Sequence, residues 1–328
     1  MISIADLAKA VGVSSSTVSR ALNGKKGVSD EVRDQIIKLS QKMGYEPNDV
    51  ARALITKRSG LIGLIIPDML SLYYNSIAKG VSDYLMEHGK NVLICSSQRD
   101  PKKEEQCIAL LKRHQVEGIV LISVTADDRT VNSMQNSGIK VISADNVVSS
   151  LCTSVINDNY RGARELFAHM AASGCRKIGW IGGVGRAFTT RERMRALNDT
   201  VDEGLLSLRS QDVIYVESTP QNGYLCAEKL IANKVDAIFG VNDQVAIGIM
   251  KYCFDHGIRV PDDLKIAGFD DLEIGAMLSV PLTTVHQRKI RLGRKAAELM
   301  LAQIDDPDDP VKVVLDPWLV KRRSCGEL

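Results

Sequence analysis

The sequence predicts an α/β protein with a small helical front and a long body of two doubly wound lobes. Over residues 4–44 apolar side chains recur with helical spacing, whereas after Gly60 short apolar runs alternate with amphipathic stretches. A chain of 328 residues is also too long for one ordinary hydrophobic core. We therefore expect a front at 1–47, a linker at 48–58 and a body at 59–328.

The front has the spacing of a helix-turn-helix. Ser3 can cap a helix over Ile4–Ala10, and Gly12 allows a tight turn before a second helix that Ser14 caps. A third helix is expected over Asp30–Met43, because Ser29 precedes it and Gly44 ends it. Two short helices joined at a glycine are typical of an element that enters the major groove of DNA.

The second helix separates an apolar face from a polar one. Val18 and Leu22 would point inward. The outward residues are Ser15, Ser16, Thr17, Ser19 and Arg20. Short hydroxyl side chains allow close approach to a duplex, and an arginine can donate two hydrogen bonds to guanine. A plain three-helix bundle with a solvated serine-rich face is the alternative.

Composition and charge limit the function further. The chain is 45% apolar and 25% charged, and its longest near-continuous apolar stretch, about Leu61–Pro67, is far below the ~20 residues of a membrane span. The N-terminus lacks a signal-peptide pattern, so we expect a cytoplasmic protein with no membrane partner. The first 60 residues hold ten Lys/Arg and six Asp/Glu, whereas the remainder carries a net charge of −2. The positive excess thus lies where phosphate contacts would be made.

The body alternates predicted strands and helices, which indicates parallel sheets covered by helices. The strands are expected at 61–67, 92–96, 118–122, 140–144, 177–182, 213–216, 237–241 and 265–269. The helices are expected at 75–88, 101–114, 161–173, 193–206, 222–233, 244–256 and 290–304. This is too many units for one sheet, so we predict two lobes, at about 59–157 with 287–315 and 158–286 with 316–328.

Polar side chains follow the predicted strands at their carboxyl ends, where open parallel sheets bind ligands. They are Ser96, Ser123, Asp145, Asn242, Asp243, Asp270 and Asp271. Helix capping would explain Asp243 and Asp271. Acceptors for ligand hydroxyls would explain Asp145, Asn242 and Asp270.

Nothing in the sequence predicts catalysis, a metal or a cofactor. The Gly182–Gly185 segment lacks the dinucleotide-binding spacing, and P-loop, HExxH and GxSxG motifs are absent. The five histidines are dispersed, and the seven scattered cysteines favour buried thiols over disulfides or zinc. We therefore expect a binding protein and not an enzyme.

Ordered motifs along nearly the whole chain resemble the LacI/GalR (lactose-repressor) family. They are Ala5–Ala8, Gly12–Ser14, Thr17–Arg20, Leu22-Asn23, Gly44-Tyr45, Pro47-Asn48, Ala51–Leu54 and Ile62–Pro67. The resemblance implies that Ser15, Ser16 and Arg20 read bases and that Thr17, Ser19 and Asn23 contact the DNA backbone. It also implies a hinge helix over Asn48–Thr56 whose DNA-contacting residues are Asn48, Ala51 and Leu54. Leu54 would insert between central base pairs in the minor groove, or would be an ordinary apolar residue of a linker helix.

The same resemblance implies an effector site between the lobes. Its expected residues are Tyr73, Tyr74, Ser123, Asp145, Asn157, Arg193, Asn242 and Asp270. Ala196-Leu197 and Ser218 depart from the family pattern, which puts the shape of the cleft in doubt. Arg186 and Arg191 could add positive charge for an acidic or phosphorylated sugar, but solvation at the surface explains both better.

These expectations describe a homodimeric transcriptional regulator, a repressor, on a pseudo-palindromic double-stranded operator. A small molecule, a sugar or sugar derivative, would bind between the lobes and lower operator affinity. The alternatives are a sugar-binding protein of the periplasmic type without DNA function and an enzyme of sugar metabolism.

Overall fold

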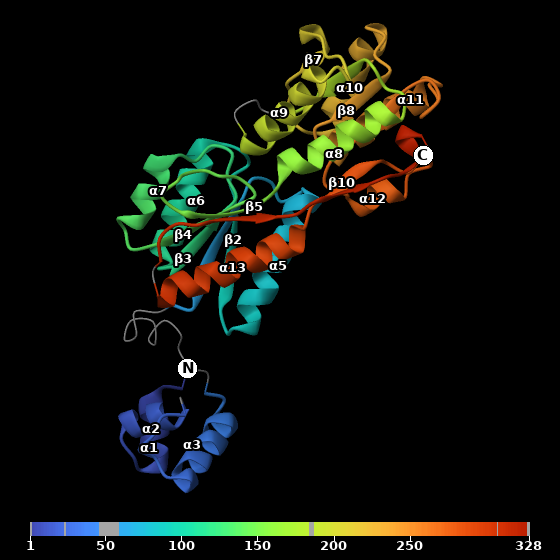
Figure 1. The fold of residues 1–328 in the computed structure, drawn as a ribbon. Helices are drawn as coiled ribbons and strands as arrows, with labels where there is room; N and C mark the ends of the chain where they lie inside the picture. The colour runs from blue at the N-terminus through green and yellow to red at the C-terminus, as the bar shows by residue number, and fades with distance from the viewer. Residues whose placement is uncertain (1, 23, 46–58, 184–186, 307, 327–328) are drawn as a thin grey trace. The chain divides into compact units, whose positions relative to one another are not determined.

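The computed structural model describes residues 2–22, 24–45, 59–183, 187–306 and 308–326. They belong to two compact units, Met1–Ser59 and Gly60–Leu328, and each has its own hydrophobic core (Figure 1). No helix within the described ranges is long and apolar enough to cross a membrane.

The first unit contains the three helices expected from the sequence: α1 (Ile4–Val11), α2 (Ser15–Leu22) and α3 (Asp30–Met43). The Ser3 hydroxyl accepts a hydrogen bond from the Asp6 amide, and the Asp6 carboxylate accepts one from the Ser3 amide, so a capping box starts α1. Gly12 ends α1 with a φ of +76°, which only glycine adopts without strain. The core of the unit consists of Leu7, Ala8, Val18, Ala21 and Ile36.

One lobe of the second unit is built on a six-stranded parallel sheet with the order β11-β5-β4-β3-β1-β2. The strands are β1 (Leu61–Ile66), β2 (Asn91–Ser96), β3 (Gly118–Leu121), β4 (Lys140–Ala144), β5 (Thr153–Asn157) and β11 (Lys312–Leu315). Helices α5 (Leu72–Glu87) and α13 (Lys289–Asp305) pack on one face, and α6 (Pro101–Arg113) and α7 (Asp128–Gln135) pack on the other. Successive strand residues alternate between the two faces, so both sides of the sheet are buried.

The other lobe is built on a four-stranded parallel sheet with the order β7-β6-β8-β9. Its strands are β6 (Ile178–Ile181), β7 (Val213–Ile214), β8 (Ala237–Gly240) and β9 (Lys265–Ala267). Its helices are α8 (Asn159–Ala172), α9 (Phe188–Asp202), α10 (Pro220–Ala232), α11 (Asp243–Asp255) and the short α12 (Glu273–Ala276). Helices α8 and α9 pack together, as do α10 and α11, and all four bury apolar side chains against the sheet.

Within the described residues the chain passes between the two lobes three times. β5 leads into α8, β10 (Thr284–His286) leads into α13, and β11 leads into β12 (Trp318–Val320). β10 and β12 pair antiparallel beside these passages. The α/β class with two parallel, doubly wound sheets, predicted from the sequence, is confirmed.

Several elements were not predicted: α7, α12 and the strands β5, β10, β11 and β12. β5 shows the reason, because its sequence, Thr-Ser-Val-Ile-Asn, has no apolar run although all five residues are buried. Its Thr153 hydroxyl binds distant parts of the chain: it accepts from Gln303 Nε2 at 2.8 Å and from the Val311 amide at 3.1 Å. A local pattern cannot reveal partners 150 residues away.

Helices α5 and α13 cross at two facing glycines. A methyl group on Gly80 would meet the carbonyl oxygen of Ile290, and one on Gly293 would meet that of Ile77, both well inside van der Waals distance. The obstacles are backbone atoms, which a rotamer change cannot move. The absence of these two side chains therefore allows the helices to pack this closely.

We expect Gly293→Ala to lower the free energy of unfolding by about 1–3 kcal/mol, because overpacking against backbone outweighs the ~1 kcal/mol gain in helix propensity. Urea denaturation measures the effect. Arg291→Ala, an exposed change on the same helix, is the control and should stay within about 0.5 kcal/mol of the parent. A stabilised Gly293→Ala variant would contradict the close packing.

Candidate functional site

The predicted DNA-facing surface lies on α2. Ser15, Ser16 and Arg20 are exposed and Thr17 and Ser19 are half-buried, while Val18 and Ala21 point into the core. Ser14 starts the helix: its hydroxyl accepts from the Thr17 amide at 3.2 Å and lies 2.7 Å from the Ser16 hydroxyl. The remaining predicted DNA contacts, Asn23, Asn48, Ala51 and Leu54, lie outside the described residues, as does the predicted hinge at 48–56.

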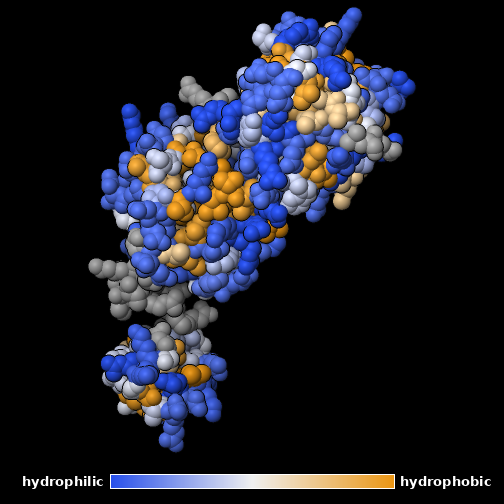
Figure 2. Space-filling model, in the orientation of Figure 1, coloured by the Kyte–Doolittle hydropathy of each residue, from blue (hydrophilic) through white to orange (hydrophobic). Residues whose placement is uncertain are grey.

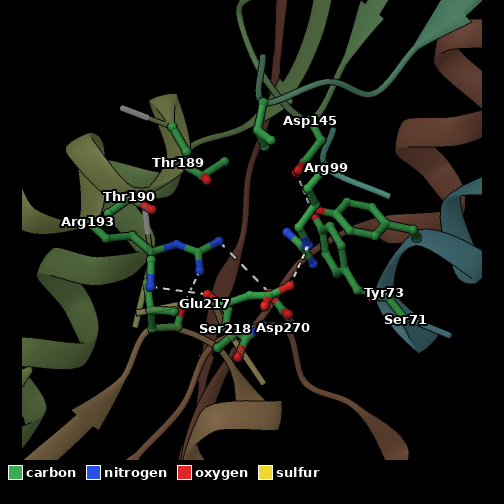
Figure 3. A pocket seen from close by; sticks show the side chains of 16 residues that line it. Ser71, Tyr73, Arg99, Asp145, Thr189, Thr190, Arg193, Glu217, Ser218 and Asp270 are labelled. Carbon is green, nitrogen blue, oxygen red and sulfur yellow. Dashed lines mark hydrogen bonds and ion pairs between the residues drawn. The ribbon is translucent and has the colours of Figure 1, made fainter. Parts of the chain in front are cut away.

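A pocket opens in the second unit beyond the carboxyl ends of strands from both sheets (Figure 3). Its lining comprises Ser71, Tyr73, Tyr74, Arg99, Val124, Asp145, Gly183, Ala187, Thr189, Thr190, Arg193, Glu217, Ser218, Val241, Asn242 and Asp270. It bounds about 670 Å³ of space, part of which is open to solvent.

Arg193 projects from α9 into this pocket and is only 6% exposed. Its Nε donates to the Asn159 side-chain oxygen at 2.9 Å, and its Nη1 donates to the Val241 carbonyl at 2.5 Å. The guanidinium lies 3.8 Å from the centre of the Phe269 ring, and Nη2 lies 3.9 Å from Asp270 Oδ1. These contacts fix the plane of the guanidinium so that it can present donors to a ligand.

Two buried carboxyl groups lie opposite each other across the pocket. Asp145 follows β4 and Asp270 follows β9, and each is 4% exposed. Their φ angles, +68° and +120°, lie in the region that favours glycine. Non-glycine residues keep such conformations where the surrounding structure imposes them, which occurs often at binding sites.

Burial changes the acidity of both groups. Loss of solvent raises the pKa of Asp270 to about 8, although nearby Arg193 opposes the change. Loss of solvent also raises the pKa of Asp145, against the hydrogen bond from Tyr73. The Tyr73 hydroxyl lies 2.5 Å from Asp145 Oδ1, and its ring meets the Tyr74 ring edge-to-face at 5.4 Å.

Six of the eight residues predicted for an effector site line this pocket, and two do not. The six are Tyr73, Tyr74, Asp145, Arg193, Asn242 and Asp270. The Ser123 hydroxyl instead accepts from the Thr125 and Ala126 amides, so it holds the loop after β3. Asn157 Oδ1 accepts from the Arg288 amide at 3.1 Å, so it joins two of the passages between lobes.

Helix capping was assigned to the wrong neighbours. Asn242, and not Asp243, caps α11, because Asn242 Oδ1 accepts from the Val245 amide at 3.0 Å. Asp243 is fully buried and accepts from the Thr284 hydroxyl at 2.6 Å and the Leu272 amide at 2.7 Å. This burial raises the pKa of Asp243 to about 6. Leu272, and not Asp271, is the N-cap of α12.

Asp271 lies at the passage between lobes and contacts both His286 and Arg322. Its carboxylate lies 2.7 Å from His286 Nδ1 and 2.6 Å from Arg322 Nη2. His286 stacks on Trp318 at 3.8 Å, and the Arg288 guanidinium lies 4.9 Å from the same ring. The cluster thereby connects the loop after β9 to both strands of the β10–β12 pair.

Sequence reasoning did not select Gln287, Arg99 or Glu217 for the site. Gln287 is fully buried, and its amide contacts both the Tyr73 hydroxyl and Asp270. Arg99 and Glu217 face each other at 3.9 Å on the pocket wall. Gln287 directly follows the short strand β10, and recognition of that strand would have been the one local signal for it.

Comparison with known proteins identifies the architecture. Residues 3–48 match the family model described as bacterial regulatory proteins, lacI family, and residues 167–325 match that of the periplasmic binding protein-like domain. The transcriptional regulator DegA of Bacillus subtilis is 32% identical and covers 99% of this chain and 98% of its own. The chain belongs to the LacI family. The family predicted from the sequence motifs is thus confirmed, and this LacI-family protein is a transcriptional regulator.

Two further similarities support this assignment. The ribose operon repressor of Halalkalibacterium halodurans is 31% identical over 99% of this chain and 97% of its own. The lac repressor dimer bound to operator and the anti-inducer ONPF has the same fold, with a TM-score of 0.89, 22% identity and 99% of each chain covered.

We expect Asp271→Asn to lower the free energy of unfolding of this LacI-family protein by about 1–2 kcal/mol at pH 7. Hydrogen bonds from His286 and Arg322 lower the pKa of Asp271 to about 2, so its stabilisation is complete above the ordinary pKa of 3.8. It is lost as the pH falls from about 4 through 2.

Urea denaturation from pH 7 to pH 3 measures this difference, which should shrink below about pH 4. Asp262→Asn is the control, because Asp262 is 65% exposed and 3.8 Å from Arg259. A pH-independent difference would contradict the assigned ion pair.

Proposed function

We propose that this protein is a repressor that binds a specific DNA sequence and whose affinity for that operator is controlled by a small molecule in the pocket around Arg193. The observation that carries the proposal is the convergence of one buried arginine, two buried carboxyls and two tyrosines on one pocket in a LacI-family chain. Fixed donors and acceptors beside aromatic rings are suited to vicinal hydroxyls. The ligand we propose is a sugar or sugar derivative.

The DNA-binding surface we propose comprises Ser15, Ser16, Thr17, Ser19, Arg20, Asn23, Asn48, Ala51 and Leu54. The exposed hydroxyls of α2 allow close approach to the duplex, and Arg20 supplies the longest donor among the described members of this surface. We assign residues 48–58 to a hinge and Leu54 to a minor-groove wedge. Residues 1–47 form the DNA-binding domain in this proposal and 59–328 the effector domain, in a cytoplasmic protein without enzymatic activity.

We further propose a homodimer on a double-stranded, pseudo-palindromic operator, because two half-sites require a two-fold protein. Apolar side chains gather on the face of the lobe with the six-stranded sheet (Figure 2). Leu70 is 86% exposed, and Met69 and Leu72 are about half exposed next to it. Contiguous exposed apolar residues of this kind are typical of an interaction surface.

We expect Arg20→Ala to weaken binding to a DNA sequence selected from a random library by about 5- to 100-fold, because one bidentate base contact contributes about 1–3 kcal/mol. Binding to random DNA should change much less. Lys42→Ala, which removes an exposed cation from α3, is the control and should leave sequence preference unchanged. Fluorescence anisotropy over a salt series measures both affinities, and equal losses on both DNAs would contradict base reading by Arg20.

We expect a thermal-shift screen of sugars to yield a ligand that raises the Tm and lowers affinity for the selected DNA. Arg193→Lys should reduce the response to that ligand at least 10-fold, because lysine cannot reproduce the forked contacts to Asn159 and Val241. Arg195→Lys is the matched control on the same helix, where the exposed Arg195 binds Glu192. A normal response in Arg193→Lys would place the ligand elsewhere.

A further inference from the structure

Four polar groups form a continuous chain across the pocket. Tyr73 Oη lies 2.5 Å from Asp145 Oδ1 and 3.1 Å from Gln287 Oε1, and Gln287 Nε2 lies 2.7 Å from Asp270 Oδ1. Asp145 and Tyr73 belong to the lobe of the six-stranded sheet, Asp270 belongs to the other lobe, and Gln287 lies on a passage between them. All four side chains are at least nine-tenths buried, so little of their surface is left for water to bind.

The number of hydrogens on these groups restricts their protonation. A tyrosine hydroxyl carries one hydrogen and can donate to only one of its two neighbours, and a glutamine amide can present either its oxygen or its nitrogen to each side. If Tyr73 donates to Gln287, its oxygen must accept a hydrogen bond from a protonated Asp145, and Gln287 donates to an ionised Asp270. If Tyr73 donates to Asp145, the amide is reversed and Asp270 must be the protonated acid.

The two other protonation states leave either a hydrogen-bond contact or a buried charge without a partner. With both carboxyls ionised, Tyr73 must donate to Asp145 and Gln287 must donate to Asp270. The Tyr73 oxygen and the Gln287 oxygen then face each other with no hydrogen between them. With both carboxyls protonated, the hydrogen bonds can form, but the buried Arg193 guanidinium, 3.9 Å from Asp270 Oδ1, loses its facing carboxylate. Unpaired polar groups in a desolvated site are costly, so the chain favours one proton for two acids.

We propose that Asp145, Tyr73, Gln287 and Asp270 hold a single shared proton, and that the pocket consequently takes an uncharged polyhydroxylated ligand whose binding weakens when the proton is lost. The ligand class rests on the proposed function, whereas the shared proton rests on the geometry alone. The chain also spans both lobes, so separation of the lobes would break it and free the proton. Binding and proton uptake are therefore linked.

The charges around the chain support an uncharged ligand. With one proton shared, the described lining carries Arg99 and Arg193 against Glu217 and one carboxylate, and its net charge is zero. Each arginine already faces an acid of the pocket: Arg99 Nε lies 3.9 Å from Glu217 Oε1, and Arg193 Nη2 lies 3.9 Å from Asp270 Oδ1. The charged and titratable groups facing the two acids from neighbouring elements are Arg193, Asp243, Lys289, Arg99 and Tyr74.

The direction of the pH effect follows from the raised pKa of both acids. An acid with a higher pKa in the closed site than in water binds its proton more tightly there, so the closed site is favoured at lower pH. The stabilisation of the closed site by this proton is lost as the pH rises through the Asp270 pKa of about 8. Ligand affinity should therefore fall between pH 7 and pH 9.

Infrared absorption of protonated carboxyl groups in D₂O tests the shared proton on the full-length protein. At pD 7, Asp145→Asn and Asp270→Asn should each remove one protonated carboxyl relative to the parent, because either amide lets the remaining acid ionise with every hydrogen bond satisfied. Asp212→Asn is the control: Asp212 is a buried carboxylate bound to Arg209 and Asn233 outside the pocket, and the absorption should not change.

The outcomes separate a shared proton from an independent one. If Asp145→Asn leaves the absorption intact and only Asp270→Asn removes it, Asp270 holds its proton alone and the proposal is wrong. If circular dichroism shows that an amide variant is unfolded, the parent protein still tests the shared proton. Its absorption must decrease by one carboxyl between pD 7 and pD 9, and an unchanged absorption overturns the proposal.

Thermal shifts with D-ribose, D-glucose, ribose 5-phosphate and gluconate test the ligand class at pH 7 and pH 9. Compounds that raise the Tm should be uncharged, and their effect should shrink several-fold at pH 9. A charged derivative that raises the Tm where its uncharged parent does not would overturn the ligand class. If no sugar raises the Tm in a broad panel, the proposed function and the ligand class both fail, while the infrared result still decides the shared proton.

Discussion

Burial of charge in the pocket is the constraint on which the functional half of this structure depends. Taking a guanidinium and two carboxyls out of water is costly unless each finds partners. Arg193 finds them in Asn159, Val241 and the Phe269 ring. The carboxyls find them in Tyr73 and Gln287. These partners come from both lobes and from a passage between them, so the pocket is complete only when the lobes are held together.

Because the pocket needs residues from both lobes, a bound ligand can change how the lobes are arranged. A ligand changes an equilibrium between arrangements only if it binds one of them better than the other. The lobe with the six-stranded sheet contributes Asp145 and Tyr73, and the other lobe contributes Arg193 and Asp270. A ligand that contacts both sets stabilises the arrangement that brings them together. The glycine contact between α5 and α13 holds these two helices of the first lobe close together.

The sequence predicted the fold class, the family and most of the strands because these depend on local patterns. Runs such as Leu61–Ile66 are apolar throughout, and capping residues such as Ser3 mark the first residue of a helix in the sequence itself. β5 was missed because its buried polar residues bond to partners far along the chain. Gln287 was missed as a site residue for the same reason: its importance comes from Tyr73 and Asp270, which are distant in sequence. The capping of α11 was misassigned because adjacent Asn242 and Asp243 are both good caps, and only Thr284 and the Leu272 amide decide between them.

Trp318 gives the passage between the lobes an optical property. The chain contains two tryptophans, and Trp180 is fully buried in one lobe with its indole N–H bound to the Gly182 carbonyl. Trp318 is 41% exposed and lies between the His286 ring and the Arg288 guanidinium. Its emission therefore depends on the positions of both neighbours, while Trp180 keeps its buried surroundings. We therefore expect a rearrangement of the lobes to change the intrinsic fluorescence of the unlabelled protein.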